Sequence, residues 1–429
     1  MNMKLFHDKN FSLLMITKFI SIIGTRMQDF ALSLYVLKKT GSATLFASVL
    51  IVGIIPQIIL TPVAGVFADW LDRKKMIIYL DMLSGIVITC FAVLYMVRGE
   101  LSLLNIYILV AILSLCSTFY QPTIGTIVPM IVKEEYLVEA NGLNSIIMNL
   151  GSVIAPLIAG ILFGFHGLFV IMIVNAISFA VGSIIELGID IPKVSMKSQK
   201  INFKAFYVDF SQGIKFIRNR KIILQVIILA PILNFVLTPL LSIGVTYVSK
   251  SIFKVSDSQY GFMEMASVLS MMIAPFCVSN YIKTHSLGKI LFGGILISSI
   301  LIAVMAFIPT PLYLSLFRSN LIPFISFTII VFLIGGLLAT INIALMSMFQ
   351  KLVPISMLGR VGAVMSTGCM SFIPLGQLFF GMLFDNLSAW ICILISSLIL
   401  FITILIFKNT LLSAIEDEGC VVMEQKVTT

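Results

Sequence analysis

Residues Ile222 to Tyr247 read IILQVIILAPILNFVLTPLLSIGVTY, a run that contains no charged side chain. A helix needs about 20 mostly apolar residues to cross a bilayer, and lipid leaves its backbone to form its own hydrogen bonds. The run therefore predicts a membrane-spanning helix. A strand of a membrane β-barrel would alternate apolar and polar side chains, and runs such as Ile391 to Phe407 show no alternation.

The composition of the whole chain agrees with this interpretation. Its 429 residues are 59% hydrophobic and 11% charged, whereas soluble domains are about 45–50% apolar and roughly 25% charged. A water-soluble enzyme is thereby excluded. The six cysteines lie scattered without paired spacing, which predicts free thiols. No phosphate-binding glycine loop is present, so we expect neither direct ATP drive nor a cofactor.

Apolar runs broken by charged residues, glycine and proline predict twelve spans. These are residues 11–37, 44–68, 76–97, 103–131, 140–164, 168–189, 222–248, 258–282, 288–308, 319–349, 361–384 and 388–407. The expected fold is an all-α integral membrane protein with two pseudo-symmetric six-helix bundles. Its parts would be an N-terminal bundle at 1–190, a cytoplasmic linker at 191–220, a C-terminal bundle at 221–408 and a cytoplasmic tail at 409–429.

Two further patterns concern the linker and the symmetry of the halves. Helical spacing predicts an amphipathic helix on the inner leaflet, carried by Phe203, Phe206, Tyr207, Phe210, Ile214 and Ile217. Pro156 in the fifth span corresponds to Pro374 in the eleventh, and each lies in a helix rich in small residues. Weak internal symmetry of this kind is typical of secondary transporters.

The basic residues predict the topology. Of 28 Lys and Arg, 20 lie in the loops on the side of the two termini, 6 lie on the other side, and Lys18 and Arg26 lie within the first span. Because cytoplasmic loops hold the excess of Lys and Arg, both termini are expected in the cytoplasm of a multi-pass cell-membrane protein. The net charge of +9 is thus a topology signal, and no nucleic-acid partner is expected.

The loop between the second and third spans reads Gly65-Val-Phe-Ala-Asp69-Trp-Leu-Asp72-Arg73-Lys74-Lys75, and Asp81 follows in the next helix. It resembles the cytoplasmic loop signature of the major facilitator superfamily. The resemblance implies a cytoplasmic gate made of Gly65, Asp69, Asp72, Arg73, Lys74, Lys75 and Asp81. Arg73 could bridge to Asp81 or to a helix end. The alternative is a positive-inside turn with incidental acids.

The fifth span carries a second pattern, made of Gly142, Gly151, Ala155, Pro156 and Gly160. It resembles the antiporter motif of the same superfamily, with Ala155 and Ala159 in place of glycine; generic helix packing is the alternative.

Other phrases resemble the drug:proton antiporter branch that includes macrolide efflux proteins and enterobactin exporters, namely Gly24-Thr25, Gln28-Asp29-Phe30-Ala31-Leu32, Thr40-Gly41-Ser42, Pro62-x-x-Gly65, Pro129 and Glu139-Ala140-Asn141-Gly142. The loop at 283–289 departs from the family pattern because it lacks the acidic residue.

Charged groups within spans are costly and therefore functional candidates. Asp29, three residues after Arg26, is the candidate for proton coupling, and a static Arg26–Asp29 pair is the alternative. Glu186 is expected to snorkel or to pair with a basic loop residue. Polar residues that could line a cavity, or simply bond other helices, are Gln28, Tyr120, Gln121, Asn149, Asn234, Glu264, Asn342 and Gln377.

These observations, with the resemblance, predict a secondary active exporter of small amphipathic or hydrophobic compounds that are drug-, macrolide- or siderophore-like. Its mechanism would be antiport with protons by alternating access. The alternative is a proton- or sodium-coupled importer of a sugar or another small nutrient. Partners would be the substrate, protons or sodium, and the lipid bilayer, and the chain is expected to be a monomer. An enzyme is not expected, because no cluster of His, Asp or Cys stands at an interface.

Overall fold

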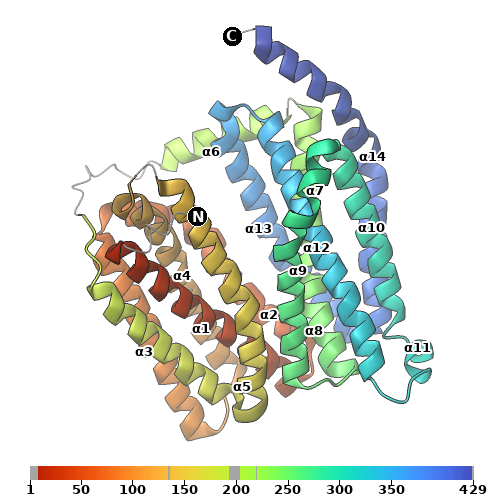
Figure 1. The fold of residues 1–429 in the computed structure, drawn as a ribbon. Helices are drawn as coiled ribbons and strands as arrows, with labels where there is room; N and C mark the ends of the chain where they lie inside the picture. Colours follow the sequence, from red (N-terminus) through yellow and green to blue (C-terminus); the bar gives the residue numbers. More distant parts are fainter. Residues whose placement is uncertain (1–7, 134–135, 193–202, 219, 428–429) are drawn as a thin grey trace. The chain divides into compact units, whose positions relative to one another are not determined.

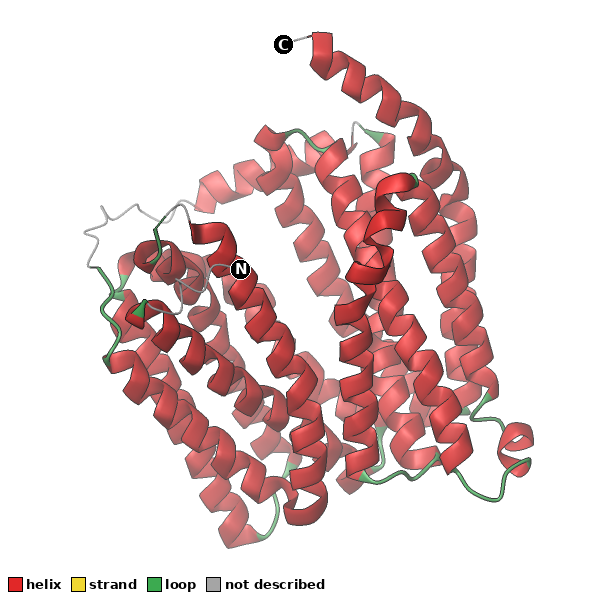
Figure 2. Ribbon diagram, in the orientation of Figure 1, coloured by secondary structure: helices red, strands yellow, loops and turns green. Residues whose placement is uncertain are grey.

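The computed structural model describes residues 8–133, 136–192, 203–218 and 220–427. Figure 2 shows that the described chain consists of helices joined by short connections. This follows from the bilayer as solvent, because a helix satisfies its backbone hydrogen bonds internally. The quoted run from Ile222 to Tyr247 is helical throughout, and π-helical turns interrupt it after Pro239.

Five helices form the first part of the chain (Figure 1): α1 (Lys9–Thr40), α2 (Ala43–Trp70), α3 (Arg73–Arg98), α4 (Leu103–Ile131) and α5 (Leu137–Leu187). Asp8, Ser42, Asp72 and Ser102 start the first four helices, and each side chain accepts a hydrogen bond from the backbone N–H three residues later. Gly167 interrupts α5 with a φ of 72°, which glycine adopts without strain. This interruption separates the two spans predicted at 140–164 and 168–189.

The remaining elements are α6 (Phe203–Arg218), α7 (Lys221–Pro239), η3 (Leu240–Gly244), α8 (Val245–Tyr247), η4 (Val248–Ile252), α9 (Asp257–Thr284), α10 (Leu287–Phe307), α11 (Pro311–Ser315), α12 (Leu321–Leu352), α13 (Ile355–Asn386) and α14 (Ala389–Val427). Within the described residues, ten helical segments are long and apolar enough to span a membrane. One of them contains both spans of α5, and α1 falls outside the ten because it carries Lys18, Arg26 and Asp29. The predicted all-helical membrane fold with about twelve spans is confirmed.

The chain divides into two compact units. The first comprises Met1–Ile201 and Ser256–Met265, and the second comprises Asn202–Val255 and Ala266–Thr429. In the first unit α5 packs on α1 and α3, and α2 packs on α4. In the second unit α13 packs on α7, and α10 packs on α12 and α14. The start of α9 thus belongs to the first unit although the rest of that helix belongs to the second.

Helix α6 lies where the linker helix was predicted, but its apolar stripe is divided. Ile217 is buried in a core with Ile223 and Val361, whereas Ile214 is 47% exposed. The reason is that the end of α6 packs on α13, so not every apolar residue of the stripe is free to face lipid. The side chains of Phe203, Phe206, Tyr207 and Phe210 lie outside the described residues. Helix α14 continues beyond the predicted span end at 407 as far as Val427.

Candidate functional site

The predicted pair of charges in α1 is present. Arg26 Nη1 lies 3.9 Å from Asp29 Oδ2, and the two side chains are 55% and 61% exposed. Both residues lie well inside the span predicted at 11–37. Lipid would make exposed charges at this depth costly, so the arrangement fits a helix face that borders water. Whether Asp29 carries protons stays a prediction.

Aromatic and acidic side chains from the start of α9 pack beside this face of α1, within the first unit. The rings of Phe30 and Tyr260 stack with centroids 5.2 Å apart. Tyr260 Oη donates a hydrogen bond to Glu264 Oε1 at 2.7 Å, and Glu264 is half-buried. The sequence prediction named Glu264 and missed Tyr260, although their spacing of four residues on one helix is a signal that could have found it.

An ion pair joins the end of α1 to the first turn of α9. Lys38 Nζ lies 2.6 Å from Asp257 Oδ2, and the Asp257 side chain is only 9% exposed. Lys38 Nζ also lies 4.8 Å from the ring centroid of Phe163 in α5. Because 219 residues separate the two charged partners, no local spacing could have predicted this pair.

Most residues of the antiporter-like segment of α5 lie in close contact with other helices. Ala155 is fully buried, and a β-carbon on Gly151 would lie 2.6 Å from Ile22 Cγ2 of α1. A β-carbon on Gly160 would lie 2.5 Å from the backbone oxygen of Asp257. Gly142 differs, because it is exposed and a β-carbon there would meet nothing within 4 Å. Small residues at 151–160 therefore let α1 and the start of α9 approach α5 closely.

The part of the predicted gate from Asp72 to Lys75, called the gate segment below, starts helix α3 and contacts the end of α5. Asp72 Oδ1 accepts a hydrogen bond from the backbone N–H of Lys75 at 3.2 Å, while Lys75 is itself exposed. Lys74 Nζ donates to the backbone oxygen of Leu187, the last residue of α5, at 2.9 Å. A cation at the negative end of a helix dipole is stabilising. Gly65 and Asp69 fall in α2, and their side chains lie outside the described residues.

Arg73 and Asp81 do not form the bridge that we considered from the sequence. Arg73 is buried, and its Nη1 contacts the sulfur of Met130 at 3.2 Å. Asp81 lies two turns further along α3 and accepts a hydrogen bond from Ser21 Oγ at 3.5 Å. The other possibility, a basic group at a helix end, is realised by the neighbouring Lys74.

Of three further cavity candidates, Gln28 and Gln377 are buried and Tyr120 is half-buried. Gln28 is 1% exposed, and its Oε1 accepts a hydrogen bond from Asn175 Nδ2 of α5 at 2.7 Å. Gln377 is 3% exposed within α13. Tyr120 Oη donates to Glu186 Oε1 at 3.1 Å. Gln28 and Tyr120 thus bond other helices, which was the alternative that the sequence left open, and a cavity role for all three residues stays a prediction.

The remaining cavity candidates keep open or partly open positions. Gln121, Asn149 and Asn342 are exposed. Asn234 is half-buried and bonds within its own helix, from Nδ2 to the backbone oxygen of Ala230 at 3.0 Å. Glu186, which was expected to snorkel or to pair with a basic residue, is fully buried and bonds Tyr120 instead. Glu186 lies close to the end of the span predicted at 168–189, and this position alone did not indicate that its side chain is buried.

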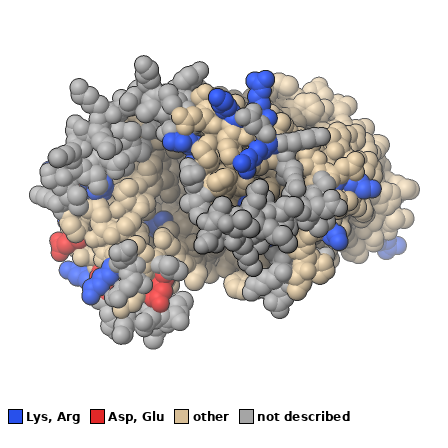
Figure 3. All heavy atoms as spheres, turned by 90° about the horizontal axis from the view of Figure 1, so that it is seen from above, with Lys and Arg blue, Asp and Glu red and all other residues tan. Residues whose placement is uncertain are grey.

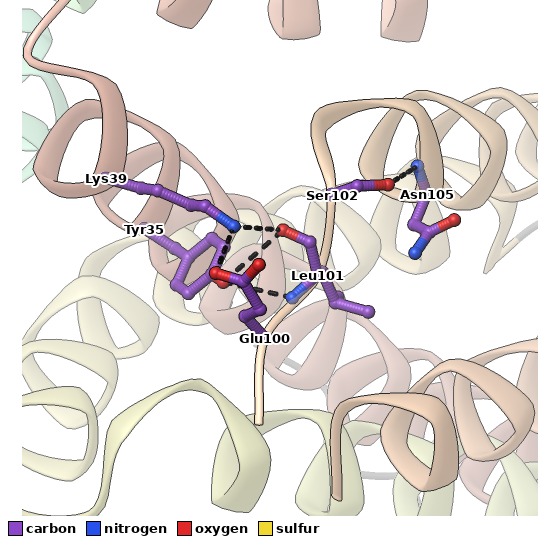
Figure 4. A network of polar contacts seen from close by, with 6 residues as sticks. All are labelled: Tyr35, Lys39, Glu100, Leu101, Ser102 and Asn105. Carbon is purple, nitrogen blue, oxygen red and sulfur yellow. Dashed lines mark hydrogen bonds and ion pairs between the residues drawn. The ribbon is translucent and has the colours of Figure 1, made fainter. Parts of the chain in front are cut away.

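A second polar network ties the end of α1 to the loop between α3 and α4 (Figure 4). Lys39 Nζ lies 2.7 Å from Glu100 Oε2 and 2.9 Å from the backbone oxygen of Leu101. Tyr35 Oη accepts a hydrogen bond from the backbone N–H of Leu101 at 3.0 Å. Lys39 lies beyond the span predicted at 11–37. The hydrogen bond to Glu100 is the main cause that raises the pKa of Lys39 above its usual 10.5.

Replacing Glu100 with glutamine is expected to have a small effect on stability. Both partners are partly exposed, with 34% and 67% of their side chains accessible, and such surface pairs contribute about 0–1 kcal/mol. Because the folded-state pKa of Lys39 is raised, its contribution is complete below the ordinary value of 10.5 and is lost as the pH rises above it. Thermal unfolding of the detergent-solubilised variant at neutral and strongly alkaline pH measures this. A loss of stability at neutral pH larger than about 1 kcal/mol would contradict this prediction.

The chain is thus a helical membrane protein with exposed charges in a span. It has a basic loop, predicted as a gate, between α2 and α3, and its helices approach each other closely at small residues. Residues 14–376 match the Major Facilitator Superfamily. The chain belongs to the major facilitator superfamily. It is therefore a secondary transporter of a small molecule in a membrane and not an enzyme.

Relatives of this transporter include drug exporters. It is 26% identical over 224 residues to macrolide efflux protein A of Streptococcus pyogenes, which covers 52% of this chain and 54% of that protein. The match thus spans about half the length of that relative. The multidrug efflux pump Tap of Mycolicibacterium fortuitum is 23% identical over 361 residues, covering 82% of this chain and 83% of the pump.

Solved structures share the fold of the transporter. A bacterial homologue of the iron transporter ferroportin in its inward-facing state gives a TM-score of 0.74 at 17% identity, covering 94% of this chain and 98% of that one. The nucleoside transporter NupG gives a TM-score of 0.72 at 16% identity, covering 96% and 99%. At these identities the likeness concerns the fold alone.

Proposed function

We propose that this transporter exports small amphipathic or hydrophobic compounds of the macrolide type in exchange for protons. Alternating access exposes a midplane site first to one side of the membrane and then to the other. Asp29 is the carboxyl group that takes up and releases the proton, and Arg26 is its partner. The two six-helix halves predicted from the sequence, at 1–190 and 221–408, are the bodies that move.

The observation that carries the proposal is the exposure of Asp29. Its side chain is 61% exposed and its ion-pair partner lies 3.9 Å away. A charge at this depth is tolerated only if it faces water or a partner, and the long distance to Arg26 leaves the carboxyl oxygen open to exchange. A tightly bonded, buried pair would instead serve packing.

Two further observations support the direction and the orientation. The relatives named as macrolide and multidrug efflux proteins favour export of a bulky apolar compound. In Figure 3, a view from above onto the end where α6 lies in Figure 1, Lys and Arg side chains are visible at several places, and Asp and Glu side chains are visible at one edge. The excess of Lys and Arg in the loops on the side of the termini supports the proposal that both termini lie in the cytoplasm.

Replacing Asp29 with asparagine is expected to uncouple export from the pH gradient. Inverted membrane vesicles with an acidic interior should take up erythromycin through the wild-type protein. In the variant, uptake should fall about tenfold, which corresponds to roughly 1.4 kcal/mol, and the remainder should no longer respond to the gradient. Asparagine keeps the size of the side chain but cannot ionise, so the change isolates the proton.

The control for this experiment is Asp190→Asn, which removes an exposed carboxyl group outside the spans and should leave uptake unchanged. Equal gradient-driven uptake in the Asp29 variant would remove Asp29 from the mechanism. If a sodium gradient drives uptake by the wild-type protein and a pH gradient does not, the coupling ion is sodium and not the proton. Accumulation in right-side-out vesicles alone would contradict export.

A further inference from the structure

Two buried acidic side chains lie on adjacent helices of the first unit, apart from Asp29. Glu186 in the last turn of α5 is fully buried, and Asp81 of α3 is 3% exposed. Gly182 lies one turn before Glu186, and a β-carbon there would lie 3.1 Å from Asp81 Oδ2. The missing side chain therefore leaves room for the Asp81 carboxyl group beside the face of α5 that carries Glu186.

Two neighbouring helices each contribute a neutral polar group to this pair. Ser21 Oγ of α1 bonds Asp81 Oδ2 at 3.5 Å, and Tyr120 Oη of α4 bonds Glu186 Oε1 at 3.1 Å. Cys116, one turn before Tyr120 on α4, is also buried. Hydroxyl groups of α1 and α4 thus bond the two carboxyl groups, which α3 and α5 carry.

The nearby cations are bonded elsewhere. Lys18, one turn before Ser21 on α1, donates from Nζ to Asn144 Oδ1 at 2.6 Å. On α3, Arg73 contacts Met130 and Lys74 bonds the backbone oxygen of Leu187. Within the described part of the chain, neither carboxyl group of the pair forms an ion pair.

One oxygen of the pair is left without a hydrogen bond. Glu186 Oε2 is buried and has no partner among the described residues. An unpaired buried charge is costly, and two close carboxylates in a low-dielectric site cannot both be ionised. A proton on one of the two groups would remove this cost, and the unbonded oxygen is a position where it can sit.

We propose that Asp81 and Glu186 share one exchangeable proton and form a second protonation site of the transporter, separate from Asp29. This inference rests on the proposed proton-coupled export. Lys74 bonds Leu187, the residue after Glu186, so the gate segment covers the same end of α5. Movement of the loop between α2 and α3 would break this bond and let water reach the pair.

Infrared spectroscopy of the purified full-length protein in lipid nanodiscs tests the shared proton directly. We expect the carbonyl band of a protonated carboxyl group to persist in the wild-type protein up to about pH 8, as documented for buried carboxyl groups. In a protein that already carries Asp29→Asn, so that the other proposed proton carrier contributes no band, the double variant Asp81→Asn/Glu186→Gln should lose the band. Each single variant should move it and alter its pH dependence, because the remaining group has lost its neighbour. Tyr120→Phe should raise its frequency, because the Glu186 oxygen loses a donor.

Asp190→Asn is the control, and it should leave the band unchanged. A band that survives in the double variant, or one that never appears in the wild type, would overturn the inference. A band that sodium removes at constant pH would assign the site to sodium instead.

Proton release on addition of erythromycin to acid-loaded vesicles then tests the coupling. Unchanged release from the double variant would exclude the pair from coupling. Absence of release from the wild type would refute the proposed export and leave the infrared result standing.

Discussion

Replacing Gly160 with leucine should reduce macrolide export to the background of a host that lacks the transporter, while the protein still accumulates in the membrane. The change places a branched side chain where two helix backbones touch. A β-carbon on Gly160 would lie 2.5 Å from the backbone oxygen of Asp257 and 3.1 Å from Gly261 Cα. Since a backbone atom cannot rotate aside as a side chain does, the start of α9 would have to move away from α5.

Export should be lost because α9 belongs to both units. Its start packs with the first unit, and the helix continues into the second. The contact between α5 and the start of α9 lies within the first unit, and we expect the proposed alternating access to depend on this packing. A leucine wedge would hold α9 away from Gly160 and would also separate Lys38 from Asp257, which now lie 2.6 Å apart.

The matched control is Gly142→Leu in the same helix. Gly142 is exposed, and a β-carbon there meets nothing within 4 Å, so export should be retained. Both variants gain the same helix propensity, since leucine is a better helix former than glycine. Erythromycin resistance in an efflux-deficient host, with protein amounts determined by immunoblot, compares them. Export by the Gly160 variant at the wild-type rate would show that the contact does not have to close.

The spans could be predicted from the sequence because the bilayer imposes length and hydropathy on each helix. The break between 164 and 168 was visible for the same reason, and the structure places a positive φ at Gly167. The hydropathy pattern could not predict whether a polar residue faces another helix or the outside of the bundle. Gln28 and Asn149 look alike in an apolar run, yet Gln28 bonds Asn175 inside the bundle while Asn149 is exposed.

Pairings over long chain separations were also beyond the sequence. The partner of Lys38 is set by how the start of α9 packs on the first unit, and no spacing within either helix encodes it. Glu186 was misjudged because its place near a span end suggested contact with water. Its burial instead depends on Tyr120 of α4 and on the space that Gly182 leaves beside Asp81.

Replacing Gly376 with leucine should destroy the folded protein rather than its transport cycle. In the second unit α13 packs closely on α7, and a β-carbon on Gly376 would overlap the backbone oxygen of Phe235 and lie 3.0 Å from its Cα. The Phe235 ring packs against Phe379 and Phe380, with centroids 5.6 and 6.1 Å away. Overpacking of a tight core costs about 1–3 kcal/mol or more, and this contact is backbone against backbone.

Gly359→Leu is the control within α13, because Gly359 is exposed and a β-carbon there would meet nothing within 4 Å. Size-exclusion chromatography of detergent extracts should show the monodisperse peak for the control and its loss for the Gly376 variant. Gly376→Ala should lie between them, with a lower midpoint of thermal unfolding. Gly376 lies two residues after Pro374 in α13, and Gly160 lies four residues after Pro156 in α5. In each helix a glycine near a proline therefore meets another backbone, and we expect the Gly376 contact to be required for folding. A Gly376→Leu protein with wild-type unfolding behaviour would contradict this assignment.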